Sequence, residues 1–220
     1  MHIFVLLTSL LLLPFIASAQ PVIVAPSAAI GCHLAPSLAT NANYPGKGKV
    51  EKSNKLIRPA GKAVLAAGER LFFMGKILDE RCVPVEGAHI ELWQTDGNGL
   101  YGTATKGELM SPSAVFAGSG TATTNNLGEF QFDTVFPAPY SNNAPRLHLR
   151  ITHPDLTPLT TDLFFQNDER NFGDARLMSL APNLRNRLMI VVSAQEISET
   201  PVLHGYIELV MRGREKFSEY

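Results

Sequence analysis

The sequence contains little cysteine, little tryptophan and no dense cluster of basic residues. Its 220 residues include two cysteines and one tryptophan, and the formal net charge is −1. Because nucleic-acid binding depends on concentrated Lys and Arg, we expect no nucleic-acid partner. The short motifs of serine hydrolases, phosphate loops, redox dithiols and zinc peptidases are also missing. Serine, lysine or carboxylate catalysis therefore has no support in the sequence.

Long apolar runs are absent after residue 19. Residues 1–19 are apolar and end in Ala17-Ser18-Ala19, the small-x-small pattern of a signal peptidase site. A membrane anchor needs roughly 20 apolar residues, and Pro14 interrupts this run. We therefore expect a cleaved signal peptide, a periplasmic or secreted protein, and no membrane attachment after cleavage. A buried helix or a retained anchor is the alternative.

The two cysteines, Cys32 and Cys82, lie far apart in the sequence. An oxidising compartment would allow them to pair and to tie an N-terminal arm to the core. Two unpaired thiols are the alternative, and the sequence does not choose between them.

Short β-like segments dominate the chain from about residue 65 onward. Residues 20–64 are rich in Pro, Ala, Gly, Ser and Asn and predict an extended N-terminal arm. Residues 65–213 predict one all-β domain, an antiparallel β-sandwich with long loops, followed by a tail at 214–220. No amphipathic helix of a dozen residues is expected after residue 19. The expected strands cover residues 71–78, 87–93, 129–135, 146–152, 159–165, 187–194 and 203–211.

Alternation along residues 146–152 separates an apolar from a polar face. Leu147, Leu149 and Ile151 share one face, so His148 is expected on the other, either as surface decoration or in a polar cleft. Tyr140 precedes this strand in a loop, close enough for the two side chains to meet. Tyr101 follows a Gly-rich turn in a third segment. Each residue alone is more often structural, but loops at the end of a rigid β-domain commonly assemble a site.

Several motifs resemble the intradiol ring-cleavage dioxygenases, the family of catechol and protocatechuate 3,4-dioxygenases. The most specific is Pro-Val-x-Gly-Ala-x-Ile-Glu-Leu-Trp-Gln-x-Asp-x-x-Gly-x-Tyr at residues 84–101. It is followed by Thr-x-x-x-Gly-Glu-Phe-x-Phe-x-Thr at 124–134 and by Ala-Pro-Arg-Leu-His at 144–148. The resemblance covers roughly residues 32–211, although the usual Gly-Pro-Tyr-Tyr element is reduced to Tyr-Pro-Gly at 44–46.

This resemblance implies a non-haem Fe(III) enzyme that opens a small aromatic diol with O2 to a muconate-type diacid. Carried over by motif, Tyr101 matches the tyrosinate that stays bound, and Tyr140 matches the catalytic one that leaves and takes a substrate proton. His148 matches the second histidine of the family's His-x-His. Trp93, Gln94 and Asn143 are the expected substrate-binding residues. A homodimer is left open.

The family's first ligand histidine falls on Arg146, whose guanidinium has no lone pair to give to a metal. Three outcomes fit. Iron binds with a water in that place, while Arg146 swings away or steadies negative charge as a catalytic residue. Alternatively, His89 or His153 reaches in. In the third outcome the metal is lost, and the cationic pocket binds a phenolic or carboxylated ligand.

A second class of protein also fits part of the sequence. Residues 75–79 and 84–88 form a strand–turn–strand motif that resembles transthyretin-like sandwich modules. Such a module would bind a ligand without turning it over, so an inactive family member or a binding module is the alternative function.

Overall fold

The computed structural model describes residues 32–38, 44–45, 49–58, 65–101, 116–195 and 202–214. All of them belong to the compact unit Gly31–Tyr220. The expected signal peptide at 1–19 lies outside these residues, as does all but the first residue of the tail at 214–220. Within the described part of the chain, no helix has the length and apolar character needed to cross a membrane.

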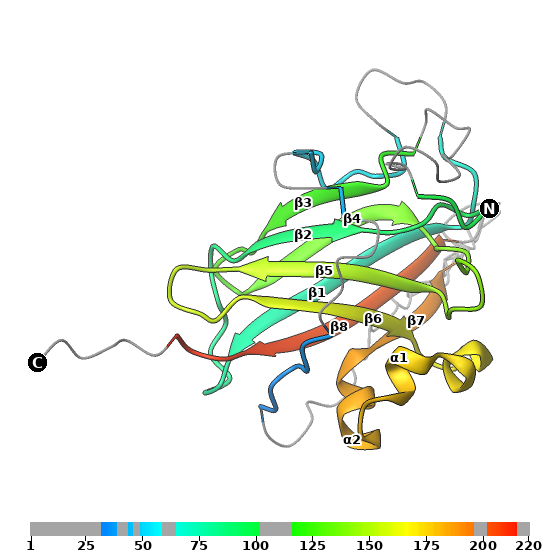
Figure 1. The fold of residues 1–220 in the computed structure, drawn as a ribbon. Coiled ribbons are helices and arrows are strands. Elements are labelled where there is room, and N and C mark those ends of the chain that lie inside the picture. The colour runs from blue at the N-terminus through cyan, green and yellow to red at the C-terminus, as the bar shows by residue number, and fades with distance from the viewer. Residues whose placement is uncertain are drawn as a thin grey trace, which may run out of the picture. The chain divides into compact units, whose positions relative to one another are not determined.

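Within the described residues, eight strands form a single sheet in the order β3-β2-β5-β6-β7-β8-β1-β4 (Figure 1). The pairs β1–β8 and β6–β7 are parallel, and the other pairs are antiparallel. The edge strands β3 and β4 contact each other, so the sheet nearly closes on itself. The all-β class is confirmed, whereas a sandwich of two separate sheets is not. The strands are β1 Arg70–Asp79, β2 His89–Trp93, β3 Ser119–Thr123, β4 Glu129–Val135, β5 Arg146–Thr152, β6 Leu159–Phe165, β7 Met189–Gln195 and β8 Val202–Met211.

The core is built from the apolar residues that alternate with polar ones along the strands. Leu147, Leu149 and Ile151 on β5 have no exposed surface, as the pattern predicted. Packing is tight where β1 pairs with β4, because a Cβ on Gly75 would lie 2.5 Å from the Phe130 ring. Since the apolar residues of β5 face this core, Arg146 and His148 occupy the opposite face, which carries the site.

Four short helices fill the connection between β6 and β7, at one end of the sheet (Figure 1). Asp174 begins the α1 helix as its N-cap, and its side chain accepts hydrogen bonds from the backbone N–H groups of Arg176 and Leu177. These short turns place Asp174 beside the start of β5. The helices are η1 Glu169–Gly173, α1 Ala175–Met178, α2 Pro182–Arg185 and η2 Asn186–Leu188.

Described parts of the N-terminal arm are bonded to the sheet. The Ala35 N–H donates to the Val210 carbonyl of β8 at 2.9 Å, and the Leu38 N–H donates to the Thr160 carbonyl of β6 at 3.1 Å. Farther along, the Leu56 N–H donates to the Asp133 carbonyl of β4 at 2.8 Å. The arm therefore bridges strands that do not pair with each other.

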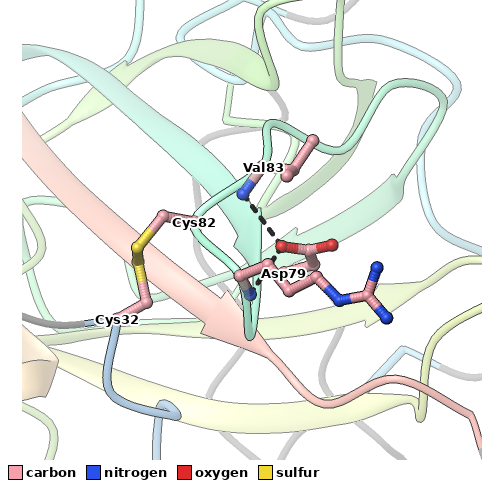
Figure 2. Close-up of a disulfide and its surroundings, with 5 residues drawn as sticks. Cys32, Asp79, Cys82 and Val83 are labelled. Atoms are coloured by element: carbon pink, nitrogen blue, oxygen red, sulfur yellow. Dashed lines mark hydrogen bonds between the residues drawn. A yellow bond between two sulfur atoms is a disulfide. The ribbon is translucent and has the colours of Figure 1, made fainter.

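Cys32 and Cys82 form a disulfide, with their Cα atoms 5.5 Å apart (Figure 2). Cys82 lies in a turn with a left-handed backbone, φ 65°. Asp79 holds this turn, because its Oδ1 accepts from the Arg81 and Val83 N–H groups, both at 2.8 Å. The pairing left open by the sequence is thus made, and it fixes the start of the described arm to the end of β1.

Candidate metal and substrate site

Strand register places an imidazole between an indole and a carboxylate. His148 on β5 is aligned with Trp93 on β2 and with Asp162 on β6. The Trp93 and His148 rings stack with centroids 5.2 Å apart and an interplanar angle of 19°. Trp93 is 1% exposed and His148 is 2% exposed, so the imidazole has little freedom to turn.

Hydrogen bonds fix the orientation of His148 further. Its Nδ1 lies 2.6 Å from Asp162 Oδ1, and its Nε2 lies 2.8 Å from the Tyr101 hydroxyl. Because a carboxylate only accepts, Nδ1–H is the donor, which leaves the Nε2 lone pair directed at Tyr101. A carboxylate behind a histidine is a common arrangement in metal sites, where it fixes the tautomer and raises the basicity of the ligand nitrogen.

A tight turn delivers Tyr101. Asp96 Oδ1 accepts from the backbone N–H groups of Asn98 at 2.8 Å and Leu100 at 3.0 Å. Gly99 has a positive φ of 81°, and a Cβ there would lie 2.5 Å from the Pro139 carbonyl oxygen. The turn that carries Tyr101 therefore packs directly on the segment that carries Tyr140.

Tyr140 is the more accessible of the two tyrosines, with 41% of its surface exposed. Its ring meets the Tyr101 ring edge-on, with centroids 5.5 Å apart. Asn143 closes the following turn, because its backbone N–H and its side-chain amide both donate to the Tyr140 carbonyl, at 3.2 Å and 3.0 Å. One phenol is thus held against His148, and the other stands at the rim.

Arg146 is enclosed by two carboxylates. Its Nη2 donates to Asp174 Oδ2, its Nη1 lies 3.4 Å from Asp162 Oδ2, and its Nε donates to the Ala144 carbonyl at 3.2 Å. The side chain is 8% exposed. Asp162 also lies 3.4 Å from the Nε of Arg176. Two guanidinium groups and two carboxylates therefore balance each other at one wall of the site, which lowers the cost of burying a charge.

A cavity of about 100 Å³ lies where these side chains meet. It is lined by the three predicted metal ligands, Tyr101, Tyr140 and His148, together with Arg146 and Asn143. Among the described residues, the lining consists of Thr95, Tyr101, Ala138, Tyr140, Asn143, Ala144, Arg146, His148 and Arg176.

Other candidates lie away from this cavity. Gln94 is fully buried, donating to the Thr95 and Val135 carbonyls and accepting from the Thr134 hydroxyl. Trp93 stacks on His148 and is not part of the cavity lining. His89 and His153 are also absent from the lining. The substrate-binding roles of Trp93 and Gln94 stay predictions.

Tyr44 belongs to the reduced Tyr-Pro-Gly element and lies next to the site. Its ring meets Trp93 edge-on at 5.0 Å, and its hydroxyl donates to Glu91 at 3.0 Å. Burial raises the pKa of Tyr44, and the hydrogen bond to Glu91 raises this pKa further. Tyr44 therefore stays a neutral phenol that supports the back of Trp93.

Sequence reasoning missed Asp174 and Arg176. Asp174 is 1% exposed and contacts Arg146, yet the two residues are distant in the sequence. A local clue was available, since Asp174 directly precedes Ala-Arg-Leu-Met, a helix-start pattern. That clue predicts a cap but not a partner for Arg146.

Comparisons with known proteins identify a family for this chain. The family model described as Dioxygenase matches residues 43–204. A provisionally named dioxygenase of Rickettsia felis is 41% identical over 120 residues, which cover 51% of this chain and 58% of that protein. The protocatechuate 3,4-dioxygenase beta chain of Burkholderia cepacia is 26% identical over 156 residues, 67% of this chain and 66% of that one. The match thus spans about 60% of the length of the first relatives.

Solved structures share the fold. An intradiol ring-cleavage dioxygenase from Tetranychus urticae superposes with a TM-score of 0.64 at 22% identity, covering 82% of this chain and 95% of that one. The sheet and its pocket define a β-protein built around one polar site. The chain belongs to the dioxygenase family, specifically to the intradiol ring-cleavage dioxygenases.

The residues of the cavity fit the ferric ion that this family uses. Two phenols and one imidazole are hard-to-borderline donors, and non-haem iron is held elsewhere by three protein ligands. Within the residues described, no cluster of three or more His, Cys, Asp or Glu side chains offers another metal site. Arg146 stands where the resemblance places a fourth ligand, and a guanidinium has no lone pair to give to a metal.

Proposed function

We propose that this protein is an exported intradiol dioxygenase of aromatic-compound catabolism. It opens the ring of a catechol-type aromatic with O2, using Fe(III) held by Tyr101, Tyr140 and His148. The observation that supports this most is that all three side chains, from three separate segments, line one cavity. In the balanced reaction, the bond between the two hydroxylated carbons breaks, and both oxygen atoms enter the muconate-type diacid.

The ferric ion, when bound, supplies the charge that keeps phenols ionised and draws both catechol oxygens into the site. Tyr101 is the fixed phenolate, because it follows the tight turn that Asp96 bonds and that packs on Pro139. Tyr140 is partly exposed and can swing aside, so it is the residue that takes a substrate proton. Asp162 holds the imidazole in the tautomer that offers Nε2.

A binding protein without turnover is the second candidate, and Arg146 is the observation that favours it. A guanidinium replaces a ligand histidine, and the lining also includes Arg176. Such a pocket would hold a phenolic or carboxylated ligand even without iron, in an inactive family member or a transthyretin-like module.

Iron content and colour distinguish the two functions. Purified mature protein loaded with ferric iron should show a visible tyrosinate-to-iron charge-transfer band and should open catechol or protocatechuate under O2. Tyr140→Phe should shift or abolish the band, whereas Tyr206→Phe, on the distant strand β8, should leave it unchanged. A colourless protein that binds catechol without consuming O2 would instead support the binding function.

A further inference from the structure

Charge at the site is balanced before any metal binds. Arg146 forms ion pairs with Asp162 and Asp174, and Arg176 forms an ion pair with Asp162. A ferric ion with two phenolates and a neutral imidazole adds one net positive charge beside a buried guanidinium. An unshielded charge there is costly in a low-dielectric interior. The loaded site therefore favours one further small anion.

Arg146 retains hydrogen-bond donors for such an anion. A guanidinium has five N–H groups, and the described partners of Arg146 are Ala144, Asp162 and Asp174. Each terminal nitrogen thus keeps one N–H without a partner in the described residues. Because the side chain is buried and lines the cavity, these donors have little access to solvent elsewhere.

Arg146 and His148 both line the cavity. Arg146 and His148 are two residues apart on one face of β5, so their Cα atoms are separated by roughly 6.6 Å. The guanidinium cannot bond a metal held by His148, but an oxygen-bearing group between them can contact both.

We propose that Arg146 binds a planar oxyanion of the carbonate or carboxylate class, which takes the ligand place of the family's first histidine. Planar oxyanions match the guanidinium fork with two parallel hydrogen bonds, which tetrahedral phosphate or a neutral water matches less well. The inference rests on the proposed iron site and adds its missing component. Iron binding by this protein therefore depends on the anion.

The test uses the unmodified protein in carbonate-free buffer. Iron is added as ferrous chloride and oxidised in place, and the charge-transfer band and retained iron are measured at increasing bicarbonate. Because removing even an outer-shell partner costs roughly 10- to 100-fold in metal affinity, bicarbonate in a ligand place should strengthen iron binding by at least that factor. Acetate and oxalate in place of bicarbonate distinguish inorganic carbonate from an organic acid as the source.

Two variants test whether Arg146 causes the dependence of iron binding on bicarbonate. Arg146→His supplies an imidazole, so it should bind iron equally with and without bicarbonate. Arg150→Gln changes an arginine on the same strand and face, outside the described cavity lining, and should keep the dependence. Anion-independent iron binding in the unmodified protein would overturn the inference and leave the proposed function standing. Dependence that persists in Arg146→His would also overturn it. Absence of iron binding in every variant and buffer would overturn both.

Discussion

The Nδ1 atom of His148 lies 2.6 Å from the Oδ1 atom of Asp162, and neither side chain is appreciably exposed. The other carboxylate oxygen of Asp162 lies 3.4 Å from a guanidinium nitrogen of Arg146. The buried carboxylate of Asp162 therefore orients His148, the candidate metal ligand. It also restrains Arg146, which stands in the place of the family's other ligand histidine.

Replacing Asp162 by Asn should destabilise the fold. The amide keeps the shape but removes a buried negative charge, and it can direct an N–H at an arginine. Breaking a buried ion pair costs about 3–5 kcal/mol, measurable by urea denaturation. Asp133→Asn is the control, because its partner Arg70 is 40% exposed and a surface pair contributes about 0.2–1 kcal/mol. Equal losses in both variants would contradict this assignment.

Gly99→Ala and Gly87→Ala form a matched pair. Both glycines have positive φ, 81° and 76°, so alanine costs about 1–2 kcal/mol of backbone strain in each. Only Gly99 also meets a neighbour, the Pro139 carbonyl, while a Cβ on Gly87 has nothing within 4 Å. Gly99→Ala should thus lose a further 1–3 kcal/mol, roughly, and weaken the iron band by displacing Tyr101. Identical stability and colour in the two variants would refute this.

The disulfide should contribute strongly to stability. Cys32 and Cys82 are 50 residues apart, and a loop of that length corresponds to about 4 kcal/mol in the chain-entropy model. Reduction, or substitution of both cysteines by alanine, should lower the midpoint of urea unfolding. Adding reductant to the alanine variant is the control and should change nothing. A midpoint that is insensitive to reductant in the unmodified protein would count against this contribution.

Alkaline pH should destabilise the protein through Tyr206. Burial raises the pKa of this phenol, and its hydrogen bond to Glu208 raises it further. Since the pKa is higher in the folded than in the unfolded state, the contribution to stability is complete below about pH 10 and is lost as pH rises towards the folded pKa. Tyr206→Phe should therefore lose less stability with rising pH, measured by urea denaturation. Parallel pH profiles would show that Tyr206 does not carry the effect.

Most strands could be predicted because they alternate apolar and polar residues. The expected segments at 129–135, 146–152 and 159–165 coincide with β4, β5 and β6. Strand β3 was missed because its sequence, Ser-Gly-Thr-Ala-Thr, has almost no apolar side chain. The structure explains this composition: a Cβ on Gly120 would lie 2.4 Å from the Ser53 carbonyl oxygen. Small residues there leave room for the arm.

Parts of the site could be predicted from family motifs rather than from the alternation of apolar and polar residues. Tyr101, Tyr140 and His148 were identified through the motif resemblance, and the cavity includes all three. The enclosure of Arg146 was not foreseen, because Asp174 reaches it across a long stretch of chain. Local periodicity contains no information on such a contact.

Strands β1 and β8 are paired in parallel, from Leu71 with Leu203 to Asp79 with Met211. The first strand of the sheet thus completes its hydrogen bonds only after the last strand has been synthesised. Long-range parallel pairing is slow to form, because the intervening chain must be closed before the contacts stabilise it. On the ribosome, the edge of β1 that pairs with β8 stays open until β8 has been translated, so nascent chains of this protein should depend on chaperones more than those of a local helical bundle.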